Sequence, residues 1–227
     1  MRAVAAEFGV GRDTVFRWSR PMPSDAIDAN CWICSATPIS GAREPSYVYL
    51  LGQYLGDGHL VVRTRVPKLR IACADNYPGI SSEVDIAMEV VCGHRPGSVA
   101  GTGCSERYSY WMHWPCVIPQ YGTGPKHKRP IHLVAWQKEL VAEHPWQLIR
   151  GLIHSDGCRS INRVSVNART YSYPRYLFAN ESRDILAIMG DTLDLVGVEW
   201  RYNRPNSISV AKRTSVALLD EHVGPKS

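Results

Sequence analysis

Two short segments of the sequence each end an apolar stretch with an aspartate and a glycine. They span residues 50–58 and 149–157, and their aspartates, Asp57 and Asp156, lie 99 residues apart. Each segment has the composition of an apolar helix, which places its aspartate at the C-terminal end. A carboxylate is unfavourable there because the helix dipole is already negative at that end. Two such aspartates in equivalent positions indicate that a shared cation stabilises both.

Small residues within these segments predict that the two helices pack against each other. They stand four apart in each helix: Gly52 and Gly56, then Gly151 and Ser155. This spacing puts them on one helical face and lets two backbones approach closely. Asp57 and Asp156 then meet at the end of the helix pair. Gly58 and Gly157 are expected to be left-handed caps that release the chain into a strand.

Two carboxylates that meet in this way predict a metal site. They repel each other or take up a proton unless a divalent cation bridges them. Hard oxygen ligands select Mg²⁺ or a similar ion such as Mn²⁺. A pair of metal-bound carboxylates suits phosphodiester hydrolysis, because the metal activates a water and stabilises the leaving oxygen.

From Tyr47 onward the chain consists of one unit written twice. We expect a first unit over residues 47–130 and a second over residues 131–227, each with the order helix, two strands, helix, two strands, helix. The units also end alike, with a repeated tripeptide: Gly124-Pro125-Lys126 and Gly224-Pro225-Lys226. The sequence therefore predicts an α+β fold, a pseudo-two-fold pair of αββαββα units preceded by a small helical segment.

The strands that follow each motif alternate basic or polar residues with apolar ones, as half-buried strands do. In the first unit the polar positions are Arg63, Arg65, Lys68 and Arg70; in the second they are Arg163, Ser165, Asn167 and Arg169. We expect the intervening apolar residues to rest on helices and the polar face to contact base edges and phosphates. The alternative is a merely solvated face, but these strands lack the acids that such faces usually mix with bases.

The residues before the first unit divide into two parts. Residues 1–20 are similar to a helix-turn-helix, and their second helix presents a polar face that could read DNA: Arg12, Thr14 and Arg17. The alternative is a capped helical hairpin without DNA contacts. Residues 21–46 are expected to be a linker, in which Cys31 and Cys34 form either half of a zinc knuckle or a turn with buried thiols.

The composition of the chain says less about its class than the motifs do. The chain has 227 residues, 44% hydrophobic content, seven cysteines and a net charge of +5. No apolar run approaches the ~18 residues that cross a bilayer, and the odd cysteine count fits reduced thiols. We therefore expect a cytoplasmic, DNA-associated protein. The net charge of +5 permits binding to a polyanion such as DNA but does not by itself indicate it.

These features together resemble the LAGLIDADG homing endonucleases of the single-chain, two-motif kind, over residues 47–227. The resemblance implies a saddle of two four-stranded sheets that straddles duplex DNA in the major groove, with the motif helices as the domain interface. It implies that Asp57 and Asp156 bind a divalent metal. Gly56 and Ser155 fall where members of that family use a backbone carbonyl near the metal.

The family also places a basic residue just before the closing helix of each unit, near the attacking water. In the second unit Lys212 or Arg213 fits, whereas the equivalent positions of the first are Met112 and His113. The first unit thus departs from the pattern, which raises the prospect of nicking, slow cutting or lost activity.

Two functions follow from the resemblance. The first is a monomeric, sequence-specific endonuclease that cuts double-stranded DNA with Mg²⁺ or Mn²⁺. The second is a transcriptional regulator with the same saddle that binds DNA without cutting it. Retention of both Asp57 and Asp156 favours cleavage, because a protein that only binds DNA gains little from two unfavourable carboxylates.

Overall fold

The structure is a computed structural model that describes residues 39–167, 169–224 and 226. The predicted helix-turn-helix, with Arg12, Thr14 and Arg17, and the Cys31–Cys34 pair lie outside the described residues. Within the described part, no helix is long and apolar enough to span a bilayer.

The described chain contains two copies of the same element order, as predicted. A 3₁₀ turn, η1 (Gly41–Arg43), precedes the first copy, which consists of α4 (Glu44–Asp57), β1 (Gly58–Val61), β2 (Lys68–Ala74), α5 (Pro78–Cys92), β3 (Gly97–Ala100), β4 (Cys104–Tyr110) and α6 (Trp114–Val117). A connector carries η2 (Lys126–Lys128) and α7 (Ala135–Glu143). The second copy consists of α8 (Pro145–Asp156), β5 (Gly157–Val166), β6 (Arg169–Ala179), α9 (Arg183–Leu195), β7 (Arg201–Arg204), β8 (Ser207–Val210) and α10 (Arg213–His222).

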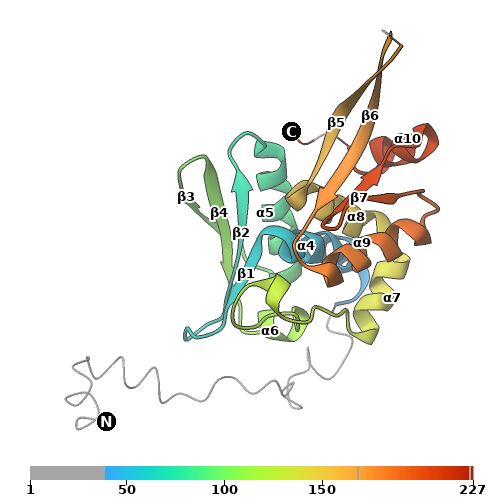
Figure 1. Cartoon of the computed structure of the whole chain (residues 1–227). Coiled ribbons are helices and arrows are strands. Elements are labelled where there is room, and N and C mark those ends of the chain that lie inside the picture. Colours follow the sequence, from blue (N-terminus) through green and yellow to red (C-terminus); the bar gives the residue numbers. More distant parts are fainter. Residues whose placement is uncertain (1–38, 168, 225, 227) are drawn as a thin grey trace, which may run out of the picture.

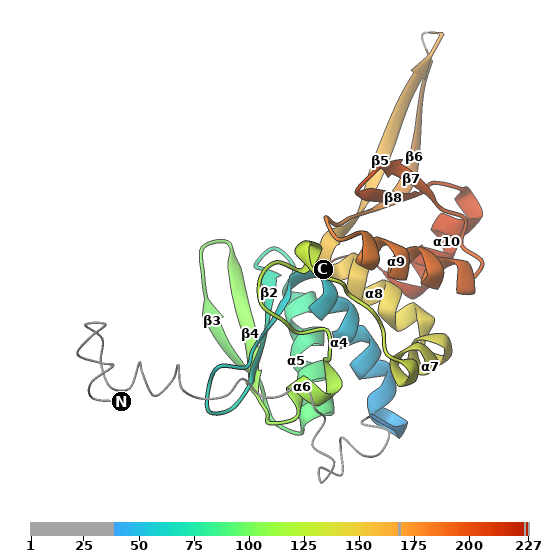
Figure 2. The ribbon, with the colours of Figure 1, turned by 60° about the horizontal axis from the view of Figure 1, so that its bottom comes forward.

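The strands form two antiparallel sheets of the same topology. Their orders are β1-β2-β4-β3 and β5-β6-β8-β7. The α4–α8 pair lies between the sheets, with α5 against the first and α9 and α10 against the second (Figures 1 and 2). The predicted α+β class and the paired αββαββα units are confirmed.

The helix boundaries follow from local sequence. Pro45 and Pro145 lie in the first turns of α4 and α8, where a missing N–H costs nothing. The hydroxyl of Ser182 accepts a hydrogen bond from the N–H of Ile185 and caps α9. Gly93 ends α5 in the left-handed conformation, with φ of 75°.

The two motif helices form the centre of the core. Every residue of α4 from Tyr47 to Leu55 is buried, which is expected only for a helix surrounded by other elements. On α8 the apolar side chains of Leu148, Ile149 and Leu152 are fully buried. The core therefore runs continuously through both units.

Small residues let α4 and α8 touch through their backbones. A Cβ added to Gly52 would lie 2.7 Å from the carbonyl oxygen of Leu148, and one added to Gly151 would lie 2.3 Å from that of Tyr49. One turn onward, a Cβ on Gly56 would lie 2.2 Å from Oγ of Ser155. The small residues thus face each other, and the helices run parallel.

The prediction of left-handed caps at the motif ends is wrong. Gly58 has φ −87° and ψ 152°, and Gly157 has φ −99° and ψ 170°, so both are extended. Glycine is required there for space: an added Cβ would lie 2.4 Å from Cα of Tyr54 or 2.7 Å from Cα of Ile153. The strand begins directly after each helix and turns back against its last turn, which leaves no room for a side chain.

The predicted strand over Arg63 and Arg65 is also wrong. Pairing between β1 and β2 stops at Val61, and both arginines lie exposed in the loop of residues 62–67. Pro67 has no N–H with which to continue the ladder. Within the loop, the hydroxyl of Thr64 donates to the carbonyl of Val66 at 2.6 Å.

The long β5–β6 hairpin corrects a third expectation. Its outer part projects beyond the second sheet, because β8 pairs with β6 only from Tyr176 to Ala179 (Figure 1). The predicted apolar face rests on no helix there: Tyr171, which pairs with Val164, is 53% exposed. Val164 is exposed as well, whereas Ala168 lies outside the described residues.

Strand register places the polar residues of this hairpin on two different faces. Arg159 pairs with Tyr176 and Arg163 pairs with Ser172, so Arg163 shares the face of Tyr176 that packs on helices within the sheet. Ser165, opposite Thr170, lies on that same face, whereas Arg169 lies on the opposite, open face. The single predicted polar face is therefore wrong, because alternation holds within one strand, and odd-numbered residues change face across the turn between β5 and β6.

The helix contact can be tested with Gly151→Ala. Its Cβ would meet a backbone oxygen that cannot move unless the helices separate, so the free energy of unfolding should fall by roughly 3 kcal/mol or more. Chemical denaturation measures this loss. The matched control is Gly93→Ala, where no atom lies within 4 Å and φ is 75°; strain should cost only about 1–2 kcal/mol there. An equal or smaller loss for Gly151→Ala would contradict the close packing.

Candidate active site at the ends of the motif helices

The structure brings Asp57 and Asp156 to the same end of the helix pair. They are the last residues of α4 and α8. A Cβ built on Gly56 would lie 3.0 Å from Oδ2 of Asp156, so the second acid reaches the backbone of the first motif. The two aspartates, Gly56 and Ser155 thus gather at one place, the seam between the units.

The surroundings of both carboxyl groups favour the protonated form. Although Asp57 is exposed at the surface, the protein atoms around its carboxyl raise its pKa, and the charge of Asp156 raises it further. Burial also raises the pKa of Asp156, against a hydrogen bond donated by Nδ2 of Asn180 to its Oδ2 at 2.7 Å. This is the pattern of an acidic pair that a cation would relieve.

Two lysines supply positive charge at this site, one from each unit. Nζ of Lys126 donates to the carbonyls of Leu55 at 3.0 Å and Gly56 at 2.6 Å, and also to that of Tyr54. Nζ of Lys226 donates to the carbonyl of Ser155 at 3.1 Å. Carbonyls of a last helical turn have no partner within the helix and favour cations.

Both ammonium groups interact with the aspartates. Lys126 and Lys226 each lower the pKa of Asp57 and of Asp156. Burial lowers the pKa of Lys126 to about 8, while the two aspartates raise it. Burial likewise lowers the pKa of Lys226. The Gly-Pro-Lys repeat of the sequence therefore delivers one cation to each motif end.

The donor set fits a divalent cation. The carboxylates of Asp57 and Asp156 and the carbonyls of Gly56 and Ser155 are hard oxygen ligands. Gly56 and Asp156 line a polar pocket of about 360 Å³, whose lining also includes Lys126, His127, Asn180 and Glu181. The two carbonyls that would face a metal both accept hydrogen bonds from the lysines.

Three of the residues expected before the closing helices are exposed, and Lys212 has a partner of its own. Lys212 is half exposed and forms an ion pair with Glu199, and neither aspartate's pKa responds to it. Arg213 begins α10 as an exposed residue, and Met112 is 59% exposed. Sequence reasoning noted the Gly-Pro-Lys repeat without interpreting it, although that repeat was the available signal.

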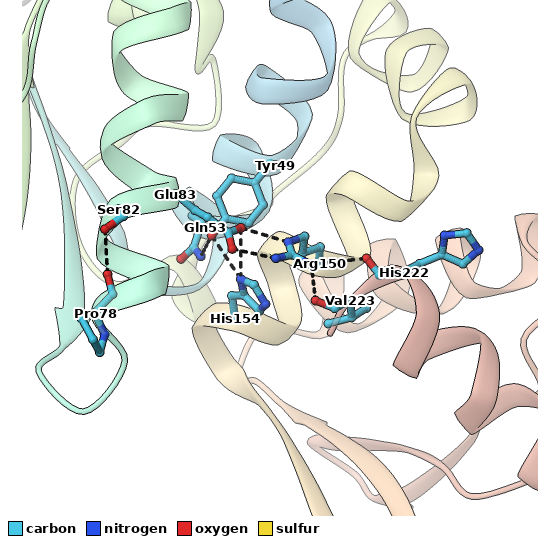
Figure 3. A network of polar contacts seen from close by, with 9 residues as sticks. All are labelled: Tyr49, Gln53, Pro78, Ser82, Glu83, Arg150, His154, His222 and Val223. Atoms are coloured by element: carbon cyan, nitrogen blue, oxygen red, sulfur yellow. Dashed lines mark hydrogen bonds and ion pairs between the residues drawn. The ribbon is translucent and has the colours of Figure 1, made fainter. Parts of the chain in front are cut away.

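His154, which precedes the second motif end, is a packed core residue. Its Nδ1 lies 3.2 Å from the hydroxyl of Tyr49, which itself accepts a hydrogen bond from Nε2 of Gln53 (Figure 3). The Tyr49 hydroxyl therefore has its hydrogen available for Nδ1 of His154. Burial lowers the pKa of His154 to about 4, so the ring is neutral at pH 7.

The open face of the first sheet carries fewer free bases than expected. Lys68 and Arg70 project there, but both pair with Glu106 of β4, at 2.8 Å and 3.1 Å. Nζ of Lys68 also lies 4.0 Å from the ring centroid of Tyr108. Glu106 was missed because it belongs to a strand that comes 36 residues after Arg70 and joins it only in the sheet.

The open face of the second sheet is more basic than expected. Register places four arginines on the side away from Tyr176 and Phe178: Arg169, Arg175, Arg201 and Arg204. The four strands of this sheet contain no acid. Asn167 lies in the hairpin turn with φ of 48°. Sequence reasoning missed Arg175, Arg201 and Arg204, since only strand pairing shows which face they share.

Solved structures share this architecture. I-DmoI, a homing endonuclease, in complex with DNA and Mn matches with a TM-score of 0.52 and 12% identity, over 80% of this chain and 97% of that one. The N-terminal LAGLIDADG domain of DUF199/WhiA matches with a TM-score of 0.51 and 12% identity, over 85% and 88% of the two chains. The meganuclease I-AabMI bound to uncleaved DNA matches with a TM-score of 0.50 and 11% identity, over 78% of this chain and 83% of that one.

No family model and no curated protein match the sequence. At these identities the similarity concerns the fold, and the chain has the LAGLIDADG fold. The resemblance drawn from the two motifs is confirmed at that level.

The raised pKa of Asp156 gives a pH-dependent test. A carboxyl whose pKa is higher in the folded than in the unfolded chain weakens folding as pH rises through these two values. In metal-free protein, Asp156→Asn should therefore raise the free energy of unfolding at pH 7.5, with the gain shrinking towards pH 4. Because the side chain is partly exposed, solvent screening should keep the gain below about 1.4 kcal/mol per unit of pKa shift.

Urea denaturation at several pH values measures this effect. Asp194→Asn is the control, because that aspartate accepts a hydrogen bond from Nε1 of Trp200 at an exposed site. A loss of stability at pH 7.5 in Asp156→Asn would show that the lysines already over-compensate the acid.

Proposed function

We propose that this protein is a sequence-specific DNA endonuclease that hydrolyses phosphodiester bonds with a divalent metal. The observation that carries the proposal is the meeting of Asp57 and Asp156 at the ends of two parallel helices, with Lys126 and Lys226 beside them. A protein needs no such concentration of acids merely to hold duplex DNA, because phosphates repel carboxylates.

Each group has a proposed role. Asp57 and Asp156, with the carbonyls of Gly56 and Ser155, would hold Mg²⁺ or Mn²⁺, which when bound activates a water and stabilises the leaving oxygen. Lys126 and Lys226 orient the last turns of the motif helices and place positive charge where the phosphate gains negative charge. A role for Lys212 stays a prediction, which its exposed ion pair with Glu199 does not support.

The DNA would lie across the two open sheet faces. Proposed contacts come from the first sheet and its loop, from the second sheet and from the hairpin: Arg63, Arg65, Lys68, Arg70, Asn167, Arg169, Arg175, Arg201 and Arg204. Arginine and lysine suit phosphates and the edges of guanine. Whether Arg12, Thr14 and Arg17 read adjacent DNA stays a prediction.

Two further observations support this proposal. One chain carries both motif helices, so a monomer forms the acidic pair without a second copy. I-DmoI, which shares the fold, is known in complex with DNA and Mn, which is consistent with a divalent cation and a DNA substrate here.

The catalytic assignment is tested with Asp57→Asn and Asp156→Asn. A target is first selected from a random duplex library by binding, and its cutting is then followed in Mg²⁺ or Mn²⁺. Each substitution should lower the cutting rate by at least about a hundredfold, since it removes a metal ligand. DNA affinity should change little. If both single variants still cut at the wild-type rate, the assignment is wrong.

The DNA-binding face is tested by the salt dependence of affinity. Arg201→Ala removes a base from the open face and should lower the slope of log K against log salt by about 1. Arg163→Ala is the matched control from the same sheet, because register places it on the other face; its slope should change less. Equal changes in the two variants would contradict the assignment of faces.

The second candidate is a DNA-binding transcriptional regulator that does not cut. Lys126 and Lys226 favour it, because they place positive charge beside the acids and occupy the carbonyls of Gly56 and Ser155 without a metal. The fold is also that of the WhiA domain. A wild-type protein that binds its selected target but cuts it in neither Mg²⁺ nor Mn²⁺ would establish this alternative.

A further inference from the structure

Arg150 of α8 ties the first unit to the C-terminal end of α10. Its Nε donates to Oε2 of Glu83 at 2.9 Å, and its Nη2 donates to Oε1 at 2.6 Å, which makes a bidentate pair with α5. Its Nη1 donates to the carbonyl of Val223 and lies 3.5 Å from that of His222 (Figure 3). One guanidinium thus links α5, α8 and α10, in the planar geometry that arginine provides.

Trp146, which lies one turn before Arg150 on α8, contacts the same end of α10. Its ring stacks on the imidazole of His222, with 4.1 Å between centroids and 17° between planes. Trp146 and Arg150 are four residues apart and therefore lie on one helical face. Together they fix the last turn of α10, whose carbonyls have no partner within the helix.

Lys226 follows this end closely in the chain. Val223 caps α10, and Gly224 turns the backbone with φ of 72°, where an added Cβ would lie 3.5 Å from Nη1 of Arg150. Two residues later, Nζ of Lys226 reaches the carbonyl of Ser155. The position of this ammonium therefore depends on where α10 ends.

Among the described residues, the first unit has no equivalent of this clamp. The residue that corresponds to Arg150 is Leu51, which is fully buried in the core. Lys126 donates to three carbonyls of the last α4 turn, whereas one hydrogen bond is recorded for Nζ of Lys226. Lys226 therefore makes fewer hydrogen bonds to its motif helix than Lys126 does. Its position depends more on the contacts that Arg150 and Trp146 make with the end of α10.

We propose that Arg150 is a positioning residue for Lys226: anchored on Glu83 of the first unit, it fixes the end of α10 and so sets the ammonium of Lys226 against the second motif end. Its consequence for cutting rests on the nuclease function proposed above, whereas the positioning does not. The clamp couples the two units, because a residue of the first decides where a cation of the second lies.

The positioning is tested by the reactivity of the two lysines. Trace acetylation of the intact protein at pH 7.5, followed by mass spectrometry, gives a labelling rate for each ammonium group. Arg150→Met should raise the rate of Lys226 about fivefold, which corresponds to the loss of one hydrogen bond of about 1 kcal/mol. Lys126 should keep its rate.

Two further variants make this result decisive. Glu83→Gln removes the charge that anchors Arg150 with little change in size. It should raise the labelling rate of Lys226 by a smaller factor than Arg150→Met does. If Arg150→Met does not fold, Glu83→Gln decides the question. Arg107→Met is the matched control: it removes another bidentate pair on α5, with Asp85, and leaves every contact of α10 in place. Unchanged labelling of Lys226 in Arg150→Met and Glu83→Gln, or an equal rise at Lys126, overturns the proposal.

The catalytic consequence is tested by cutting each strand of an end-labelled target separately. The pseudo-two-fold axis relates the two motif ends, so Lys226→Met should slow one strand more than the other. Arg150→Met should slow the same strand, and the double variant should be no slower than Lys226→Met alone. Additive losses, or slowing of the other strand, overturn the catalytic consequence. If the wild type cuts neither strand, the nuclease proposal fails while the labelling still decides the positioning.

Discussion

The direct backbone contact between α4 and α8 is the constraint on which the rest of the structure depends. Gly52 and Gly151 leave no side chain between the helices, so the helices run parallel and end together. This geometry gathers two negative helix ends and the carboxylates of Asp57 and Asp156 at one place, where all four repel one another. Positive charge or a proton at the seam relieves this repulsion.

The two units supply that charge in different ways. Lys126 is held locally by three carbonyls of the last α4 turn, and burial lowers its pKa. Lys226 has one such contact, and the clamp of Arg150 and Trp146 fixes the helix from which it follows. The sheet faces differ as well, since Glu106 pairs with two bases of the first while the strands of the second contain only basic charges. A pseudo-symmetric backbone thus carries two unequal half-sites.

The choice between the two candidate functions depends on whether the lysine ammonium groups or a divalent metal bind the oxygens at the motif ends. An ammonium group and a divalent metal favour the same oxygens, the carbonyls of Gly56 and Ser155 and the nearby carboxylates. A metal that binds there has to share these oxygens with the lysines or displace them. The strength of that competition separates a nuclease from a protein that only binds DNA.

The sequence by itself determined the repeated αββαββα order, the apolar motif helices, the small residues between them and the meeting of their ends. These are local properties, because periodicity and residue spacing are visible in a single segment. Only the tertiary structure decided which cations reach the acids, since Lys126 and Lys226 stand about 70 residues after their motifs. Strand register likewise put Arg163 and Arg169 on opposite faces and brought Glu106 to Lys68. Alternation is a local pattern, but which of its two faces is buried depends on helices and strands far away in the chain.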